Sequence, residues 1–254
     1  MQIKPYSPIG LLILLETMLL YACTADEWIS HPENDMVQLS AAITPLSGST
    51  RAHVGDKGNE SFQVDDKITL FVTPQGEFSS GTLGRTMRLT TEGWSPKLAW
   101  QEIAGDQVNL TAFYPEMSDC NSEIFTHTVA SDQRLTELFA KSDLLAASIE
   151  VGRGNAVSLN FRHWMSLIEL HLTSNTFTPE QLSEAVIHIQ ACPSVQIQTI
   201  PVPEVMQPVE TQVEDIIFHQ GEPNVYHVIL PPQLIQETWR RKCIEVELEG
   251  NTYV

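Results

Sequence analysis

Short runs in which apolar and polar residues alternate dominate the chain from residue 36 onward. Residues 67–73, for example, place Ile68, Leu70 and Val72 on one side. Because successive side chains of a strand point to opposite faces, this period of two predicts β-strands. The same pattern predicts strands at residues 36–43, 108–114, 185–190, 195–202, 215–219, 225–230 and 244–248.

The stretch 156–173 is the longest of these patterns and is apolar on both faces. Such a segment either lies inside a sandwich or bends from one domain into another. We therefore predict a domain boundary near residue 163. It separates an N-terminal β-sandwich domain, residues 36–163, from a C-terminal β-sandwich domain, residues 164–254, and both lengths are usual for domains.

Helical patterns are few. Leu135, Leu138 and Phe139 recur at helical spacing, which predicts a helix within residues 131–147. Residues 178–181, Thr-Pro-Glu-Gln, predict a capped short turn of helix with proline at its first position. Strand patterns outweigh both, so the expected fold class is all-β, built as sandwiches.

The N-terminus carries the only long apolar run, residues 9–20. As a helix it would span about 18 Å, short of the roughly 30 Å hydrocarbon core of a bilayer, which favours a cleaved signal peptide over a permanent anchor. The run ends in Leu20-Tyr21-Ala22-Cys23, which resembles the lipobox of bacterial lipoproteins.

The lipobox resemblance implies a signal peptide over residues 1–22, cleavage between Ala22 and Cys23, and acylation of the Cys23 thiol. The alternative is an ordinary secretory signal with a coincidental cysteine. Residues 23–35 are mostly polar and begin with an acidic segment, so they resemble a tether that precedes the first strand.

Charge excludes two classes of partner. The chain carries 14 Lys+Arg against 32 Asp+Glu, a formal net charge of −18. Such a surface repels phosphate backbones and anionic headgroups, so we expect no nucleic-acid binding and no membrane docking through basic residues.

Candidate catalytic and metal-binding residues form no recognisable constellation. His163 and His171 lie about 26 Å apart on one strand at ~3.3 Å per residue, too far to share a metal ion. The neighbours Asp65 and Asp66 point to opposite faces of a strand, so they make no catalytic pair. We expect no catalytic residue, no metal site, no cofactor and no enzymatic activity.

Three cysteines follow Cys23, namely Cys120, Cys192 and Cys243. They allow at most one intramolecular disulfide among themselves, and their wide spacing is not that of a metal or redox motif. A structural role is expected for them, and the sequence leaves open which of them pair.

An ordered series of motifs runs through the N-terminal two thirds of the chain. After the lipobox and the first strand come 49–52 (STRA), 62–72 (FQVDDKITLFV), Trp94, Trp100, 112–115 (AFYP), 142–146 (SDLLA) and 161–167 (FRHWMSL). In this order they resemble the fimbrillin family, the lipoprotein pilus subunits of Gram-negative gut and oral anaerobes. Asp65 stands where that family usually has glycine.

The resemblance implies two transthyretin-like β-sandwich domains in tandem and export as a lipoprotein to the outer membrane and the fimbrium. It also implies cleavage between Arg51 and Ala52, in the segment 45–56 behind the first strand. Loss of that strand would expose an apolar groove that an extended segment of another subunit fills. The implied partners are other pilus subunits, in a homo- or heteropolymer, the outer membrane through the lipid anchor, and host or bacterial surface ligands.

The family pattern predicts further strands beyond Tyr253, so the C-terminal domain is expected to be incomplete. Either the sequence is truncated, or this member donates no strand in the usual manner.

A second hypothesis is a non-polymerising surface lipoprotein that binds glycans through Trp94, Trp100, Trp164 or Trp239. A third, a surface hydrolase, needs a paired acid or metal cluster that the sequence does not reveal.

Overall fold

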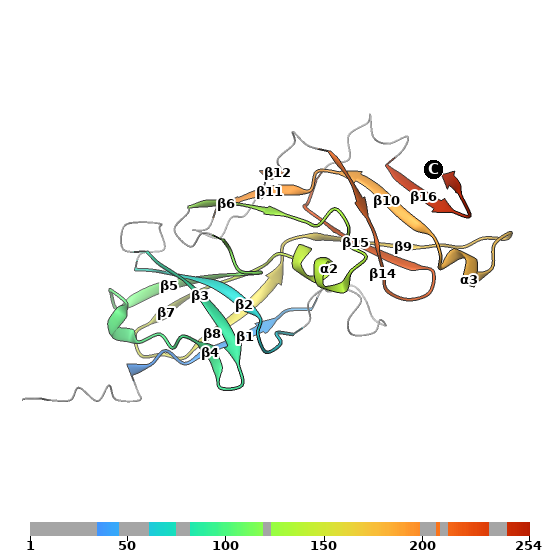
Figure 1. Ribbon diagram of the computed structural model, residues 1–254. Helices are drawn as coiled ribbons and strands as arrows, with labels where there is room; N and C mark the ends of the chain where they lie inside the picture. The colour runs from blue at the N-terminus through green and yellow to red at the C-terminus, as the bar shows by residue number, and fades with distance from the viewer. Residues whose placement is uncertain are drawn as a thin grey trace, which may run out of the picture. The chain divides into compact units, whose positions relative to one another are not determined.

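The computed structural model describes residues 35–45, 61–74, 82–118, 123–198, 207–208, 213–233 and 243–254. In these segments the chain forms β-strands joined by a few short helices, which confirms the predicted all-β class (Figure 1). No helix in the described part of the chain is both long and apolar enough to cross a bilayer.

The largest sheet has seven strands. In spatial order they are β1 (Leu39–Ile43), β8 (Val157–His163), β7 (Leu145–Gly152), β5 (Gln107–Tyr114), β2 (Lys67–Thr73), β3 (Leu83–Thr90) and β4 (Gly93–Ser95). β1 runs parallel to β8, whereas the other neighbours are antiparallel. The ladder between β7 and β8 has two residue pairs, Leu145 with His163 and Ala146 with Arg162.

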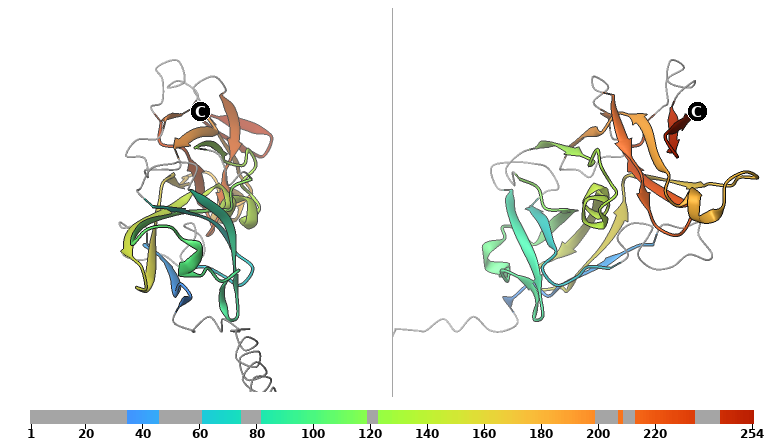
Figure 2. Two further views of the ribbon diagram at one scale, coloured as in Figure 1. Left: turned by 90° about the vertical axis from the view of Figure 1, so that its left-hand side faces the viewer. Right: turned by 45° about the vertical axis from the view of Figure 1, so that its right-hand side comes forward.

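Three smaller antiparallel sheets hold the remaining strands. The first contains β13 (Glu214–Ile217), β10 (Val186–Ala191), β16 (Ile244–Leu248) and β17 (Asn251–Tyr253), and the second contains β12 (Gln207–Pro208), β11 (Ser194–Gln198) and β6 (Ile124–Thr128). The third contains β14 (His219–Gln220), β15 (Val225–Leu230) and β9 (Ser166–His171). Figure 2 shows the C-terminal strand at the edge of its sheet, beside β16.

Two hydrophobic cores share the central strands of the large sheet. On β2, Phe71 belongs to one core and Leu70 to the other. β5 and β7 divide in the same way, because alternate residues of a strand point to opposite faces. Both faces of these strands are therefore buried.

The long apolar pattern at residues 156–173 divides into β8 and β9, which belong to different sheets. The segment therefore bends from one sheet into another, and its predicted passage from one domain into another stays a prediction. The boundary at residue 163 stays a prediction. Phe125 and Phe139 come before residue 163 in the sequence, yet they pack in the same core as side chains of β10 and β15.

The helices partly match the expectation. α3 (Pro179–Leu182) has the predicted capping box, in which Thr178 Oγ1 accepts from the Gln181 amide at 3.3 Å and Gln181 Oε1 accepts from the Thr178 amide at 2.9 Å. α2 (Thr136–Ser142) is shorter than predicted. The residues from Leu145 onward instead pair with β5, since tertiary pairing overrides a local helical pattern.

A buried glutamine links the segment before α2 to β15. The Gln133 side chain is fully buried, and its Nε2 donates to the Ile229 carbonyl at 2.8 Å while its Oε1 accepts from the Ile229 amide at 2.9 Å. Gln133 therefore satisfies both backbone groups of Ile229, as a neighbouring strand would.

Candidate functional site

β1 lies at the edge of the seven-stranded sheet and packs its apolar side on the adjacent core. Val37 and Ile43 are buried, and Leu39 and Ala41 are half-buried. Its ladder partners on β8 follow the same period, because Val157, Leu159 and Phe161 are fully buried. Removal of β1 would uncover these three side chains.

Backbone hydrogen bonds hold β1 on one side. The amide of Val157 donates to the Gln38 carbonyl, and the amide of Thr44 donates to the Phe161 carbonyl, both at 2.8 Å. Both bonds use even-numbered residues of the β1 segment, as a parallel ladder with period two requires. The odd-numbered amides face away from β8.

The N-terminal end of β1 has a second neighbour. The Val37 amide donates to the Leu98 carbonyl at 2.8 Å, and Met36 forms an isolated bridge with Ala99. Trp94 and Leu98 line a small cavity beside Val37. Among the described residues, the start of β1 thus has neighbours on both sides, whereas the strand itself pairs only with β8.

Phe62 anchors the chain just before β2. Its ring contacts Trp94, Tyr114 and Phe161 edge-on, with centroids 5.4, 5.6 and 5.0 Å apart. Burial raises the pKa of the Tyr114 phenol, and the nearby carboxylate of Asp66 raises it further. The chain downstream of the 45–56 segment is therefore fixed in the same core that β1 covers.

The predicted site residues Ala22, Cys23, Arg51 and Ala52 lie outside the described residues, as do Cys120 and Trp239. Lipidation at Cys23 and cleavage at Arg51 stay predictions. Cys192 is buried and Cys243 is half-buried.

The described tryptophans do not share one environment. Trp94 and Trp100 lie in the core that β1 covers. Trp164 is half-buried and lines an open groove on the outer side of β7 and β8. Only Trp164, among those three, is available as a platform for a sugar ring.

The two histidines that the sequence analysis compared, His163 and His171, each contact a carboxylate. Nδ1 of His163 lies 2.8 Å from Asp143 Oδ2, and both side chains are almost fully buried, so this contact joins the end of β8 to the turn after α2. His171 and Glu169 make an exposed contact of 2.6 Å on β9. No three metal-ligating side chains come together within the described segments.

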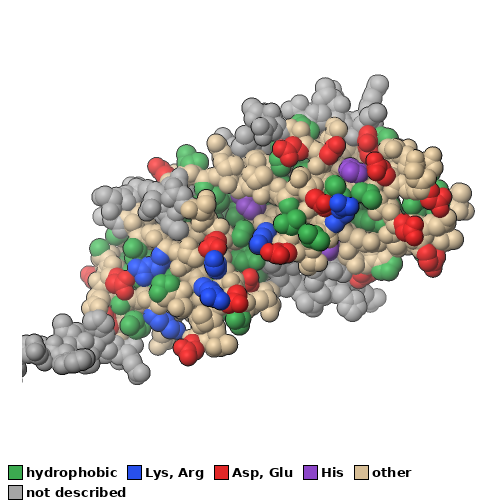
Figure 3. Space-filling model, viewed as in Figure 1, with side chains coloured by type: hydrophobic (Ala, Val, Ile, Leu, Met, Phe, Trp, Pro, Cys, Tyr) green, Lys and Arg blue, Asp and Glu red, His purple; other side chains and the backbone are tan. Residues whose placement is uncertain are grey.

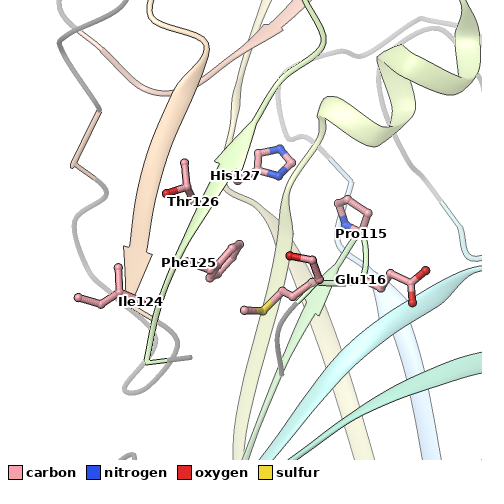
Figure 4. Close-up of a pocket in the computed structure, with 8 residues that line it drawn as sticks. Pro115, Glu116, Ile124, Phe125, Thr126 and His127 are labelled. Atoms are coloured by element: carbon pink, nitrogen blue, oxygen red, sulfur yellow. The ribbon is translucent and has the colours of Figure 1, made fainter. Parts of the chain in front are cut away.

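A second pocket, of about 470 Å³, lies between the end of β5 and β6. Figure 4 shows Phe125 between the two segments, whereas the carboxylate of Glu116 points away toward its partner Lys67, 2.8 Å distant. Nε2 of His127 lies 3.0 Å from the Ser142 carbonyl. Burial lowers the pKa of His127, and the Ser142 carbonyl and Asp143 oppose this shift. Among the described residues, the His127 ring has a backbone carbonyl, and not a hydroxyl or carboxylate, as its hydrogen-bond partner.

The sequence model of the fimbrillin-like family matches residues 50–254, which is most of the chain. The chain belongs to the fimbrillin-like family. No curated protein matches it in sequence.

Solved structures share the fold of this fimbrillin-like chain. A proposed cell adhesion protein from Bacteroides uniformis aligns with a TM-score of 0.61 at 14% identity, over 87% of this chain and 84% of the other. One from Bacteroides ovatus aligns with a TM-score of 0.59 at 17% identity, over 86% and 84%. At such identities the likeness supports the fold alone.

The family motifs take definite places in the fimbrillin-like fold. Asp65, which replaces the usual glycine, has a positive φ of 84°, so the turn is retained with a residue that tolerates this conformation. Sequence reasoning did not single out Phe62 or Arg162 by itself. The aromatic contacts of Phe62 join residues far apart in sequence, so no local pattern could reveal them.

Proposed function

We propose that this fimbrillin-like protein is a structural and adhesive pilus subunit, lipid-anchored through Cys23 in the outer membrane and assembled by β-strand complementation. Cleavage between Arg51 and Ala52 would separate β1 from the rest of the chain. The observation that carries the proposal is the edge position of β1, which covers one core and is held by one parallel ladder.

Energetics favour refilling of the vacated groove. Burial of an aliphatic side chain such as Val37 or Ile43 contributes about 1.5–3 kcal/mol, and unpaired backbone groups of β8 add a further cost. An extended segment of another subunit, with apolar residues at alternate positions, would satisfy both requirements. The ring contacts of Phe62 with Trp94 and Phe161 support this proposal, since they would keep the chain from Phe62 onward in the core after cleavage.

The proposal is tested by mass spectrometry of the mature protein from its native membrane, with both termini determined. We expect an acylated Cys23 species, and a species beginning at Ala52 in high-molecular-weight assemblies. Arg51→Gln should abolish the second species, and the control Lys57→Gln, one residue beyond the 45–56 segment, should retain it. A single intact species from Cys23 onward would contradict assembly through cleavage.

The second candidate function is glycan binding by a surface lipoprotein that does not polymerise. The position of Trp164 beside an open groove favours it. Saturable sugar binding by the intact chain, without any cleaved species, would select this function over the first.

A further inference from the structure

An open groove of about 700 Å³ lies on the outer side of β7 and β8, beyond the last pair of their short ladder. Its lining residues are Thr44, Ala146, Ala147, Ser148, Ile149, Ser158, Asn160, Arg162 and Trp164. Hydroxyl, amide and guanidinium groups thus line the same groove as one indole ring.

β8 supplies the polar side of this groove. Its odd-numbered residues are buried in the core, so Ser158, Asn160 and Arg162 point outward. Alternate residues of a strand lie about 7 Å apart, so the three groups form a row on one face. None of the three side chains has a hydrogen-bond partner within the described part of the chain.

Arg162 differs from the other cationic side chains that the structure describes. Each of the others donates to a carboxylate or a backbone carbonyl, namely Lys67, Arg85, Arg88, Lys97, Arg134, Lys141 and Arg153. Arg162 has no such acceptor among the described residues, although the chain has a formal net charge of −18. Its guanidinium is therefore free to bind an external anion.

The strands beside Arg162 leave it uncovered. Its ladder partner on β7 is Ala146. On the other side lies Thr44, which follows β1 and whose amide donates to the carbonyl of Phe161, the residue before Arg162. Both neighbours of Arg162 therefore have short side chains. Trp164 follows two residues later and packs one part of its ring on the apolar core. The groove thus combines a cation, an aromatic surface and neutral hydrogen-bonding groups.

We propose that this groove binds a carboxylate-bearing saccharide. The Arg162 guanidinium pairs with the sugar carboxylate in two parallel hydrogen bonds, and the Trp164 ring packs against the apolar face of a sugar ring. Ser158, Asn160 and Thr44 supply hydroxyl and amide partners for the sugar hydroxyls. An acidic peptide fits less well, since successive carboxylates would meet a single cation.

This inference rests on the adhesive part of the proposed function and names its ligand class. The test uses the intact full-length chain, so it does not depend on cleavage or assembly. The probes are methyl glucuronide and 3′-sialyllactose, which carry one carboxylate each, and each is compared with its neutral methyl ester by isothermal titration calorimetry. We expect saturable binding of at least one acidic probe, at least about tenfold tighter than its ester.

Variants assign the binding to this groove. Arg162→Gln should weaken the acidic probe about tenfold or more and leave the ester unchanged. The control Arg88→Gln removes an exposed arginine that is paired with Asp65, and should bind as the wild type does. Trp164→Leu should weaken acid and ester alike, whereas Trp164→Phe should retain most of the affinity.

Three results would overturn the inference: no saturable binding of either acidic probe, unchanged affinity in Arg162→Gln, or equal binding of a hexaglutamate peptide. Failure of these measurements leaves cleavage at Arg51 untouched. Conversely, a single uncleaved species in the native membrane would refute assembly through cleavage and leave this binding site standing.

Discussion

Asp65 occupies a left-handed backbone conformation, with φ of 84°, at the turn before β2. Its carboxylate pairs with Arg88, and both side chains are exposed, so this ion pair adds little stability. The backbone conformation therefore restricts which residue types fit at position 65 more than the ion pair does.

We predict that Asp65→Val lowers the free energy of unfolding by at least about 1 kcal/mol, since a β-branched residue is strained at positive φ. Asp65→Gly should be at least as stable as Asp65→Asn, which removes the charge and keeps the tolerance for this conformation. Urea unfolding of the three variants measures the difference. Equal stability of Asp65→Val and Asp65→Asn would show that the turn is not strained.

The burial of His127 leads us to predict that the free energy of unfolding depends on pH. Burial lowers its pKa in the folded protein below the unfolded value of about 6.5. The unfolded chain then binds more protons, so the free energy of unfolding falls as pH falls through about 6.5 toward the folded pKa.

The expected result is a loss of stability between pH 7 and pH 5 that is smaller in His127→Gln, as measured by chemical denaturation at each pH. His171→Gln, at an exposed position, is the control and should follow the wild type. An identical pH profile in His127→Gln would exclude this histidine as the cause.

At the scale of elements, the sequence predicted strands with strong alternation and missed weaker ones. Residues 67–73 and 225–230 match β2 and β15, since both carry closely spaced large apolar residues. β3 was missed because its side chains are mostly half-buried and its sequence alternates weakly. The pairing of β1 with β8 joins residues more than a hundred positions apart, so no local pattern could predict it.

The candidate sites show the same limit. Residue types identified Trp164 as a sugar platform, but the isolation of Arg162 depends on where every other charged side chain lies. The lipobox and Arg51 were found from sequence because they are local motifs, and they stay predictions.

The parallel ladder of β1 predicts unequal effects of proline at neighbouring positions. The amide of Ala42 lies on the side that bonds to β8, whereas the amide of Ala41 points away from β8. Ala42→Pro should therefore destabilise the protein by about 1–3 kcal/mol more than Ala41→Pro. Guanidinium unfolding of the pair provides the measurement, and equal losses would contradict the register of β1.

At the scale of the whole molecule, the charge is unevenly distributed. Residues 164–254 carry far more Asp and Glu than Lys and Arg. On the face in Figure 3, most Lys and Arg side chains lie over the seven-stranded sheet. Residues 164–254 and the longer segment 1–163 each carry half of the formal net charge of −18, so the acidity is denser in the C-terminal part of the sequence.

The two cores should unfold together, because β2, β5 and β7 contribute side chains to both. Leu110→Ala and Phe113→Ala each remove buried volume from a different core, at an expected cost of about 2–5 kcal/mol. Both should shift one common transition, seen alike by tryptophan fluorescence and far-ultraviolet circular dichroism. Two transitions, each moved by one substitution, would mean that the cores unfold as separate domains.

Gln133 gives this molecule a built-in reporter of local opening. The Ile229 amide hydrogen is held by a side chain of the segment before α2, not by a neighbouring strand. Its exchange with deuterium therefore follows the departure of that segment, even while the ladder between β15 and β9 stays closed. If the Ile229 amide exchanges faster than the amides of its neighbours in β15, its exchange rate reports how often the segment before α2 detaches from β15.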